Sequence, residues 1–189
     1  MSLSIVWLVS YCIWVASEIF IGIATRTRRS SGNVRDRGTM VLLWGVLFTS
    51  ITAGIWFSDA HGPNPPNGVH WLKTASLFVL LFGLALRWWA IVSLGKSFSS
   101  NVAIHATQRV LKTGLYGWMR HPSYTGLLLC IFAVALHTRN WISFLIIALP
   151  STTALLYRIH IEEAALRDHF GPEYVEYCRQ TKRLMPGIY

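Results

Sequence analysis

Long apolar segments alternate with short polar ones along most of the 189-residue chain. A helix needs about 20 mainly apolar residues to cross the hydrocarbon core of a bilayer, with a range of about 17–25. The fourth and fifth apolar segments are short, and the sequence "HTRN" that joins them predicts a tight helical hairpin. The pattern therefore predicts an all-α integral membrane protein with five transmembrane helices. They run over Leu3–Ala24, Met40–Phe57, Trp71–Leu94, Pro122–His137 and Trp141–Tyr157.

The composition supports this prediction, because 53% of the residues are hydrophobic and 13% are charged, whereas a soluble domain carries about 25% charged residues. The length fits a single domain, 1–189, in which about 1–94 hold three spans and about 95–189 hold the polar motifs. The three cysteines form no C-x-x-C pair, so the sequence supports neither a zinc site nor a disulfide framework, and we expect no metal.

The net charge of +9 comes from basic residues that gather in three places: after the first span, between the third and fourth, and after the fifth. The opposite side of the predicted membrane carries Lys73 and Arg139. The positive-inside rule then places the N-terminus outside and the C-terminus, with a helical segment, in the cytoplasm. Because the basic clusters alternate with apolar spans, we interpret the charge as a topology signal, and we expect no nucleic acid partner.

The sequence "GLYGWMRHPSYTG", residues 114–126, lies at the start of the fourth predicted span. Pro122 suits the first turn of a helix, where its missing N–H group costs nothing, and His121 then lies at the N-cap. A helix N-terminus favours an anion such as a ligand carboxylate, and Arg120 and His121 add hydrogen-bond donors. An interfacial anchor is an equally good interpretation on residue types alone, because aromatic and basic residues are common at membrane edges.

A second polar stretch, "RIHIEEAALRDHFGPEYVEY", continues the fifth span out of the membrane. Arg158 and Glu162 are four residues apart and share a helix face. The Gly-Pro pair at 171–172 ends this helix and starts another, on which Tyr174 and Tyr177 share a face. The alternative is a surface ion pair followed by an amphipathic tail.

Two ionisable residues, Glu18 and Arg87, lie inside predicted spans. Charged side chains are costly in lipid and are usually paired or functional. We therefore predict a structural Glu18–Arg87 pair, with a functional role as the alternative.

Together the two motifs resemble those of the isoprenylcysteine carboxyl methyltransferase (ICMT) family. The first family pattern is "G-x-Y-x-x-x-R-H-P-x-Y-x-G", and the second is an arginine, a glutamate one helical turn later, and "F-G-x-x-Y-x-x-Y". The closing "RLMPGIY" is similar to the tail of short prokaryotic members. The resemblance extends from about Leu94 to Tyr189, and the first 90 residues match only as apolar spans.

The resemblance implies S-adenosylmethionine as methyl donor, S-adenosylhomocysteine as product, and a lipophilic small molecule or prenylated substrate as acceptor. It places the chain in a prokaryotic cytoplasmic membrane with its active site facing the cytoplasm. Arg158 and Arg120 are the expected catalytic residues. The expected cofactor-binding residues are Gln108, where the family often has histidine, and Arg109, Val110, Leu111, Tyr116, His121, Pro122, Ser123, Tyr124, Glu162 and Glu163.

This chemistry needs few catalytic groups, because a carboxylate with a reference pKa of about 4 is already a nucleophile near neutral pH. Arg158 would orient it in line with the methyl group and the sulfur. The absence of a G-x-G sequence excludes a soluble Rossmann-type domain. Three alternatives remain: a phospholipid, small-thiol or amine methyltransferase of the same fold, an NADPH-dependent membrane reductase, and a non-enzymatic membrane scaffold. An amine or thiol acceptor would need a base, for which His105, His160 and Glu163 are candidates.

Overall fold

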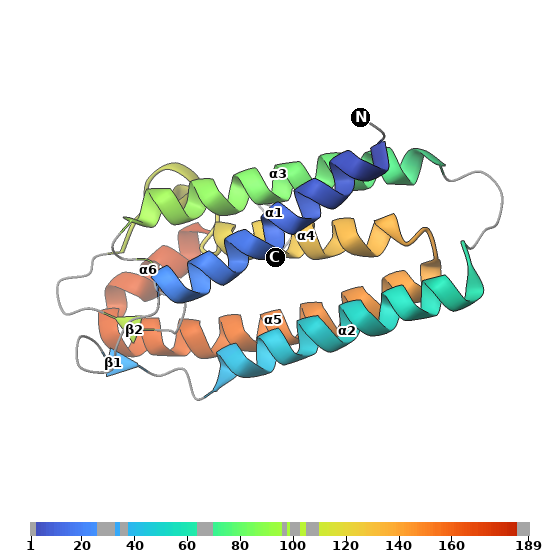
Figure 1. Ribbon diagram of the computed structural model, residues 1–189. Coiled ribbons are helices and arrows are strands. Elements are labelled where there is room, and N and C mark those ends of the chain that lie inside the picture. Colours follow the sequence, from blue (N-terminus) through green and yellow to red (C-terminus); the bar gives the residue numbers. More distant parts are fainter. Residues whose placement is uncertain are drawn as a thin grey trace.

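The computed structural model describes residues 3–25, 33–34, 38–63, 70–95, 98, 103–104 and 110–184. Helices dominate it, and the longest ones run side by side (Figure 1). The elements in chain order are α1 Leu3–Ala24, β1 Asn33–Val34, α2 Thr39–His61, α3 His70–Leu94, β2 Ala103–Ile104, the 3₁₀ helix η2 Gly114–Gly117, α4 Pro122–His137, α5 Trp141–Phe170 and α6 Pro172–Gln180.

Four helices are long and apolar enough to cross a membrane: α1, α2, α3 and α5. The helix α4 begins and ends at the predicted residues but has 16 residues, so its length is about 24 Å against a hydrocarbon core of about 30 Å. An all-helical membrane-type fold is thus confirmed with four candidate spans. The fifth span and the orientation of the termini stay predictions.

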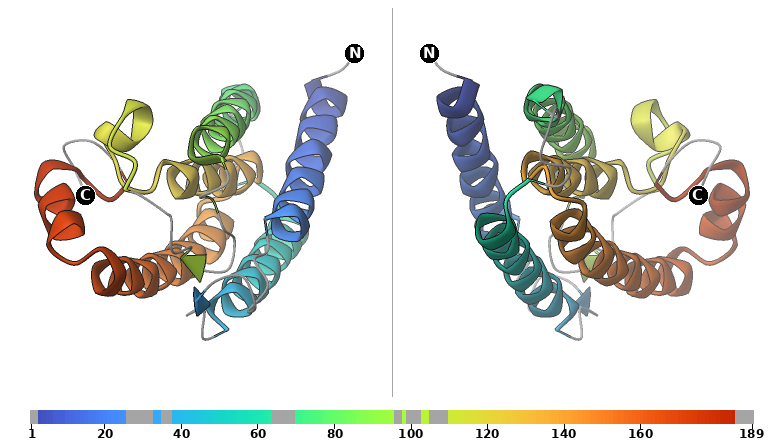
Figure 2. Two further views of the ribbon diagram at one scale, coloured as in Figure 1. Left: turned by 90° about the vertical axis from the view of Figure 1, so that its left-hand side faces the viewer. Right: turned by 90° about the vertical axis from the view of Figure 1, so that its right-hand side faces the viewer.

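The short helix α4 lies in the middle of the bundle in the end-on views, in contact with α3 and α5 (Figure 2). Gly126, the last residue of the motif at 114–126, explains why α3 can lie so close to α4. A Cβ atom at Gly126 would lie 2.7 Å from the backbone nitrogen of Arg87 and 2.7 Å from the carbonyl oxygen of Gly83. The two helices therefore pack backbone against backbone, which only glycine permits at this position.

The turn between α4 and α5 closes the end of the bundle far from the polar motifs. Asn140 caps α5, because its Oδ1 accepts hydrogen bonds from the N–H groups of Ile142 (3.0 Å) and Ser143 (3.1 Å). Its Nδ2 donates to the carbonyl oxygen of Gly62 (2.8 Å), so the same side chain holds the end of α2. The predicted tight turn at "HTRN" is confirmed.

The opposite end of the bundle carries α6, η2 and a small antiparallel pairing of β1 with β2 (Figure 1). Asn33 pairs with Ile104 and Val34 with Ala103. This pairing of two residues with two is a short addition to a fold that is otherwise helical in the described part of the chain. The pairing joins the segment between α1 and α2 to the segment between α3 and η2 at this end of the bundle (Figure 1).

Candidate functional site

The polar motif residues gather where α4 begins, beside the part of α5 that extends past its apolar half. Pro122 occupies the first turn of α4 and His121 its N-cap, as predicted. Gly114 has a φ of +59°, which favours glycine and explains the first residue of the motif. The motif at residues 114–126 thus forms η2, the N-cap of α4 and the first turn of α4.

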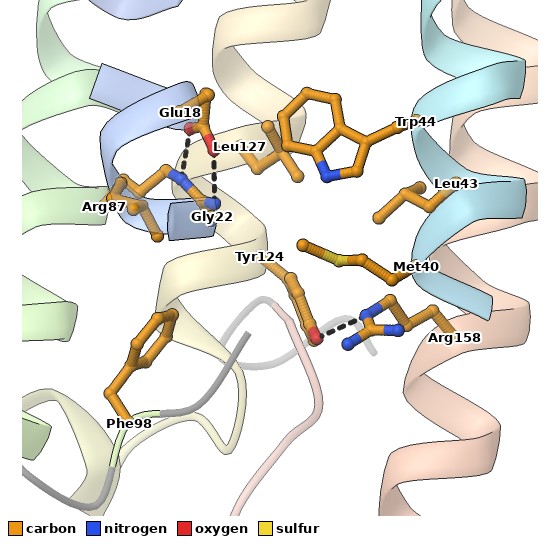
Figure 3. A pocket seen from close by; sticks show the side chains of 11 residues that line it. Glu18, Gly22, Met40, Leu43, Trp44, Arg87, Phe98, Tyr124, Leu127 and Arg158 are labelled. Carbon is orange, nitrogen blue, oxygen red and sulfur yellow. Dashed lines mark hydrogen bonds and ion pairs between the residues drawn. The ribbon is translucent and has the colours of Figure 1, made fainter. Parts of the chain in front are cut away.

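A pocket opens beside the start of α4, lined by residues of α1, α2, α3, α4 and α5 (Figure 3). Its walls are largely apolar, and two polar groups line it on different sides: the Glu18–Arg87 pair, and the side chains of Tyr124 and Arg158. The lining residues are Glu18, Ile21, Gly22, Met40, Leu43, Trp44, Arg87, Phe98, Tyr124, Leu127 and Arg158.

Arg158 is almost completely buried, with 1% of its surface exposed. Its Nη1 donates to Thr39 Oγ1 (2.7 Å) and its Nε donates to the hydroxyl oxygen of Tyr124 (3.1 Å). The Tyr124 hydroxyl in turn donates to Glu162 Oε2 (2.6 Å). The structure therefore connects Arg158 to Glu162 through Tyr124, and it adds Thr39, which no sequence motif indicated.

The predicted pair of Glu18 and Arg87 is confirmed. Arg87 Nη2 lies 2.6 Å from Glu18 Oε2, and both side chains are buried. Arg87 Nη1 also donates to the carbonyl oxygen and to the Oγ of Ser123, both at 3.0 Å. The ion pair therefore holds the first turn of α4, a link that the sequence did not reveal.

The carboxylate of Glu163 is buried among four basic side chains. Its Oε1 lies 2.9 Å from Arg120 Nε and 3.4 Å from His121 Nε2. Its Oε2 lies 3.1 Å from Arg183 Nε and 3.3 Å from Arg167 Nη2. Glu163 thus connects α4, α5 and the segment after α6.

Arg120 is fixed by more than this carboxylate. Its Nη1 donates to the carbonyl oxygens of Cys178 (3.1 Å) and Thr181. These contacts favour a role for Arg120 in holding the site together, while the catalytic role expected from the sequence stays a prediction.

The segment after α6, residues 181–184, lies against the start of α4, and we call it the strap. Two of its carbonyl groups accept hydrogen bonds from the backbone N–H groups of Arg120 (2.8 Å) and His121 (3.0 Å). A third accepts the hydroxyl of Thr125 (2.7 Å). The strap therefore forms hydrogen bonds with Arg120, His121 and Thr125, which all belong to the motif at residues 114–126.

Tyr116 and Tyr177 form a second connection. The Tyr116 hydroxyl donates to the carbonyl oxygen of Ala90 in α3 (3.1 Å), and the Tyr177 hydroxyl donates to the carbonyl oxygen of Tyr116 (2.6 Å). Burial raises the pKa of Tyr116, and it raises the pKa of Tyr177 to about 12. Both hydroxyls therefore remain protonated donors that fix η2 between α3 and α6.

The other expected cofactor residues have mixed outcomes. Gln108 and Arg109 lie outside the described residues. Val110 and Leu111 are half-buried in the chain before η2, and Pro122 is fully buried. The ring of His121 stacks on that of Tyr124, with 5.6 Å between the ring centres. The structure thus brings His121, Tyr124 and Glu162 together, while the Ser123 side chain accepts a hydrogen bond from Arg87. Whether these residues bind a cofactor stays a prediction.

Comparisons with known proteins agree with this arrangement. Residues 75–168 match the model of the isoprenylcysteine carboxyl methyltransferase (ICMT) family. This range holds the start of α4 and Arg158, Glu162 and Glu163, but neither α6 nor the strap.

Individual relatives match a longer part of the chain. The protein-S-isoprenylcysteine O-methyltransferase of Tribolium castaneum is 34% identical over 122 residues, which cover 64% of this chain and 43% of that protein. Protein-S-isoprenylcysteine O-methyltransferase B of Arabidopsis thaliana is 31% identical over 120 residues, covering 62% and 61%. This chain thus spans about half of the length of the relatives it matches.

A solved structure shares the fold. The eukaryotic intramembrane Ras methyltransferase ICMT superposes with a TM-score of 0.66 at 27% sequence identity. The match covers 77% of this chain and 52% of that one.

Proposed function

Because the chain belongs to the isoprenylcysteine carboxyl methyltransferase family, we propose that it transfers a methyl group from S-adenosylmethionine to the carboxylate of a lipophilic acceptor in the membrane. One observation carries this proposal: a buried guanidinium, that of Arg158, lines a largely apolar pocket between the membrane helices, on a different side from the Glu18–Arg87 pair (Figure 3). An arginine binds a carboxylate strongly in such surroundings. Ile21, Leu43 and Leu127 would contact the lipid tail of the same molecule.

The chain's own residues would bind and orient both molecules. Tyr124 holds Arg158 on one side and Glu162 on the other, so it lies between the acceptor pocket and the proposed cofactor site. The acceptor carboxylate needs no base, because its reference pKa is about 4. The apolar pocket walls would exclude water from the reacting atoms.

The residues at the start of α4 fit S-adenosylmethionine, which when bound supplies an electrophilic methyl group on a cationic sulfur. Glu162 is half-buried, and within the described part of the chain its carboxylate is held by Tyr124 through Oε2. Its Oε1 would accept a hydrogen bond from the ammonium group or the ribose diol. The stacked rings of His121 and Tyr124 offer aromatic faces, which attract cations.

For the topology, we propose that α4 crosses the bilayer together with the four longer helices, with the N-terminus outside and the site facing the cytoplasm of a prokaryotic membrane. The basic segments after α1, before α4 and after α5 support this orientation. The names of the relatives suggest an isoprenylcysteine-like carboxylate as the acceptor.

The test is methyl transfer from labelled S-adenosylmethionine by purified protein in nanodiscs, with a farnesylated cysteine as acceptor and its carboxamide as the matched blank. We expect Arg158→Leu to lower kcat/KM for the acceptor by roughly 10–100-fold, since hydrogen bonds to charged groups contribute about 1.5–3 kcal/mol. Arg179→Leu is the control, because Arg179 is exposed on α6 and pairs with Glu176. Folded wild-type protein that methylates no lipophilic carboxylate would refute the proposal.

A further inference from the structure

Two tyrosines of α6 form a natural matched pair. Tyr174 and Tyr177 are three residues apart, their ring centres lie 5.9 Å from each other, and both side chains are buried, with 3% and 5% exposed. The prediction that they share a helix face is confirmed. Their hydroxyl groups nevertheless have different surroundings.

The Tyr177 hydroxyl has a structural partner, the carbonyl oxygen of Tyr116 at 2.6 Å. The Tyr174 hydroxyl is buried and makes no hydrogen bond to any residue that the structure describes. Buried polar groups are nearly always paired, and an unpaired one lowers stability. A phenylalanine at 174 would pack in the same place without that cost, so packing does not account for the hydroxyl.

The surroundings of Tyr174 indicate what the hydroxyl can do. Burial raises its pKa, the negative charges of Glu163 and Glu162 raise it further, and Arg120 opposes them. The group therefore stays protonated at neutral pH and acts as a hydrogen-bond donor. Geometry links Tyr174 to the proposed cofactor site, because its ring lies 5.9 Å from that of Tyr177, whose hydroxyl donates to the carbonyl oxygen of the expected cofactor residue Tyr116.

We propose that Tyr174 is a further cofactor-binding residue, whose hydroxyl donates a hydrogen bond to an acceptor atom of the bound methyl donor. This inference rests on the proposed function. It places α6, which lies outside the range matched by the family model, in direct contact with the cofactor.

The experiment compares Tyr174→Phe with Tyr177→Phe in the full-length protein in nanodiscs. S-adenosylhomocysteine binding is measured by calorimetry, and thermal unfolding is measured without ligand. We expect Tyr174→Phe to weaken binding by roughly three- to tenfold with no loss of thermal stability. Tyr177→Phe, which loses a hydrogen bond inside the protein, is expected to unfold at a lower temperature.

The outcomes separate the two claims. If wild-type protein binds S-adenosylhomocysteine and Tyr174→Phe binds it equally well, the inference is wrong and the proposed function stands. If Tyr174→Phe lowers the unfolding temperature as much as Tyr177→Phe, its hydroxyl has a structural partner, and the inference is again wrong. If folded wild-type protein binds no S-adenosylhomocysteine, the proposed function fails and the inference fails with it.

Discussion

Replacing Glu18 by leucine would leave the guanidinium of Arg87 buried between helices without its carboxylate. Arg87 is 5% exposed and Glu18 is 3% exposed, so the pair is largely shielded from solvent. Removing one partner of a buried ion pair costs about 3–5 kcal/mol. We therefore expect Glu18→Leu to lower the free energy of unfolding by about this amount.

The double variant Glu18→Leu/Arg87→Met removes both charges. Exchanging a whole buried pair for apolar side chains is often neutral, so we expect most of the lost stability to return. Activity should stay low, because Arg87→Met also removes the two hydrogen bonds to Ser123 at the start of α4. The double variant would thus regain stability without regaining activity.

The assay is unfolding by titration with sodium dodecyl sulfate in mixed micelles, followed by circular dichroism, beside methyl transfer in nanodiscs. Glu18→Gln adds a polar control of similar size. Our interpretation of the pair is wrong if Glu18→Leu lies within about 1 kcal/mol of wild type, because a buried unpaired charge costs more than that. It is also wrong if the double variant is no more stable than Glu18→Leu.

Two further predictions concern the contacts around α4. Arg183→Gln removes an ion pair between the strap and Glu163, so limited proteolysis should cut the strap faster than in wild type. Arg167→Gln is the control, because it loses an ion pair to the same carboxylate within one helix. Equal rates of cutting in the two variants would contradict this prediction. Gly126→Ala forces a Cβ against the backbone of α3 and should cost about 1–3 kcal/mol by overpacking. Gly22→Ala is the control, because a Cβ there meets no atom of the described residues within 4 Å. Equal unfolding temperatures of the two variants would contradict the close approach of α3 and α4.

Local patterns allowed much of the fold to be predicted. The ends of α1 and α4 match the predicted residues, because an abrupt change from apolar to polar sequence marks where an apolar helix ends. The Glu18–Arg87 pair followed from the cost of charge in lipid. Whether α4 crosses the membrane is harder to predict, since its 16 residues lie below the usual length of a span.

The contacts that shape the site could not be predicted. Thr39 meets Arg158 across 119 residues of sequence, and Thr125 meets Leu184 across 59. No periodic pattern encodes such distant pairs. Residue types were also ambiguous, because an arginine such as Arg120 suits a ligand as well as the backbone carbonyl groups that it binds here.

The strap makes completion of the site depend on a segment that is synthesised after all of the apolar helices. The ribosome makes α4 well before the carbonyl group of Leu184 that accepts the hydroxyl of Thr125. The apolar helices can therefore enter the bilayer while the first turn of α4 still lacks three of its hydrogen-bond partners. A chain that lacks residues 181–184 would hold all of its apolar helices without a complete site, so formation of the helices and completion of the site are separate steps.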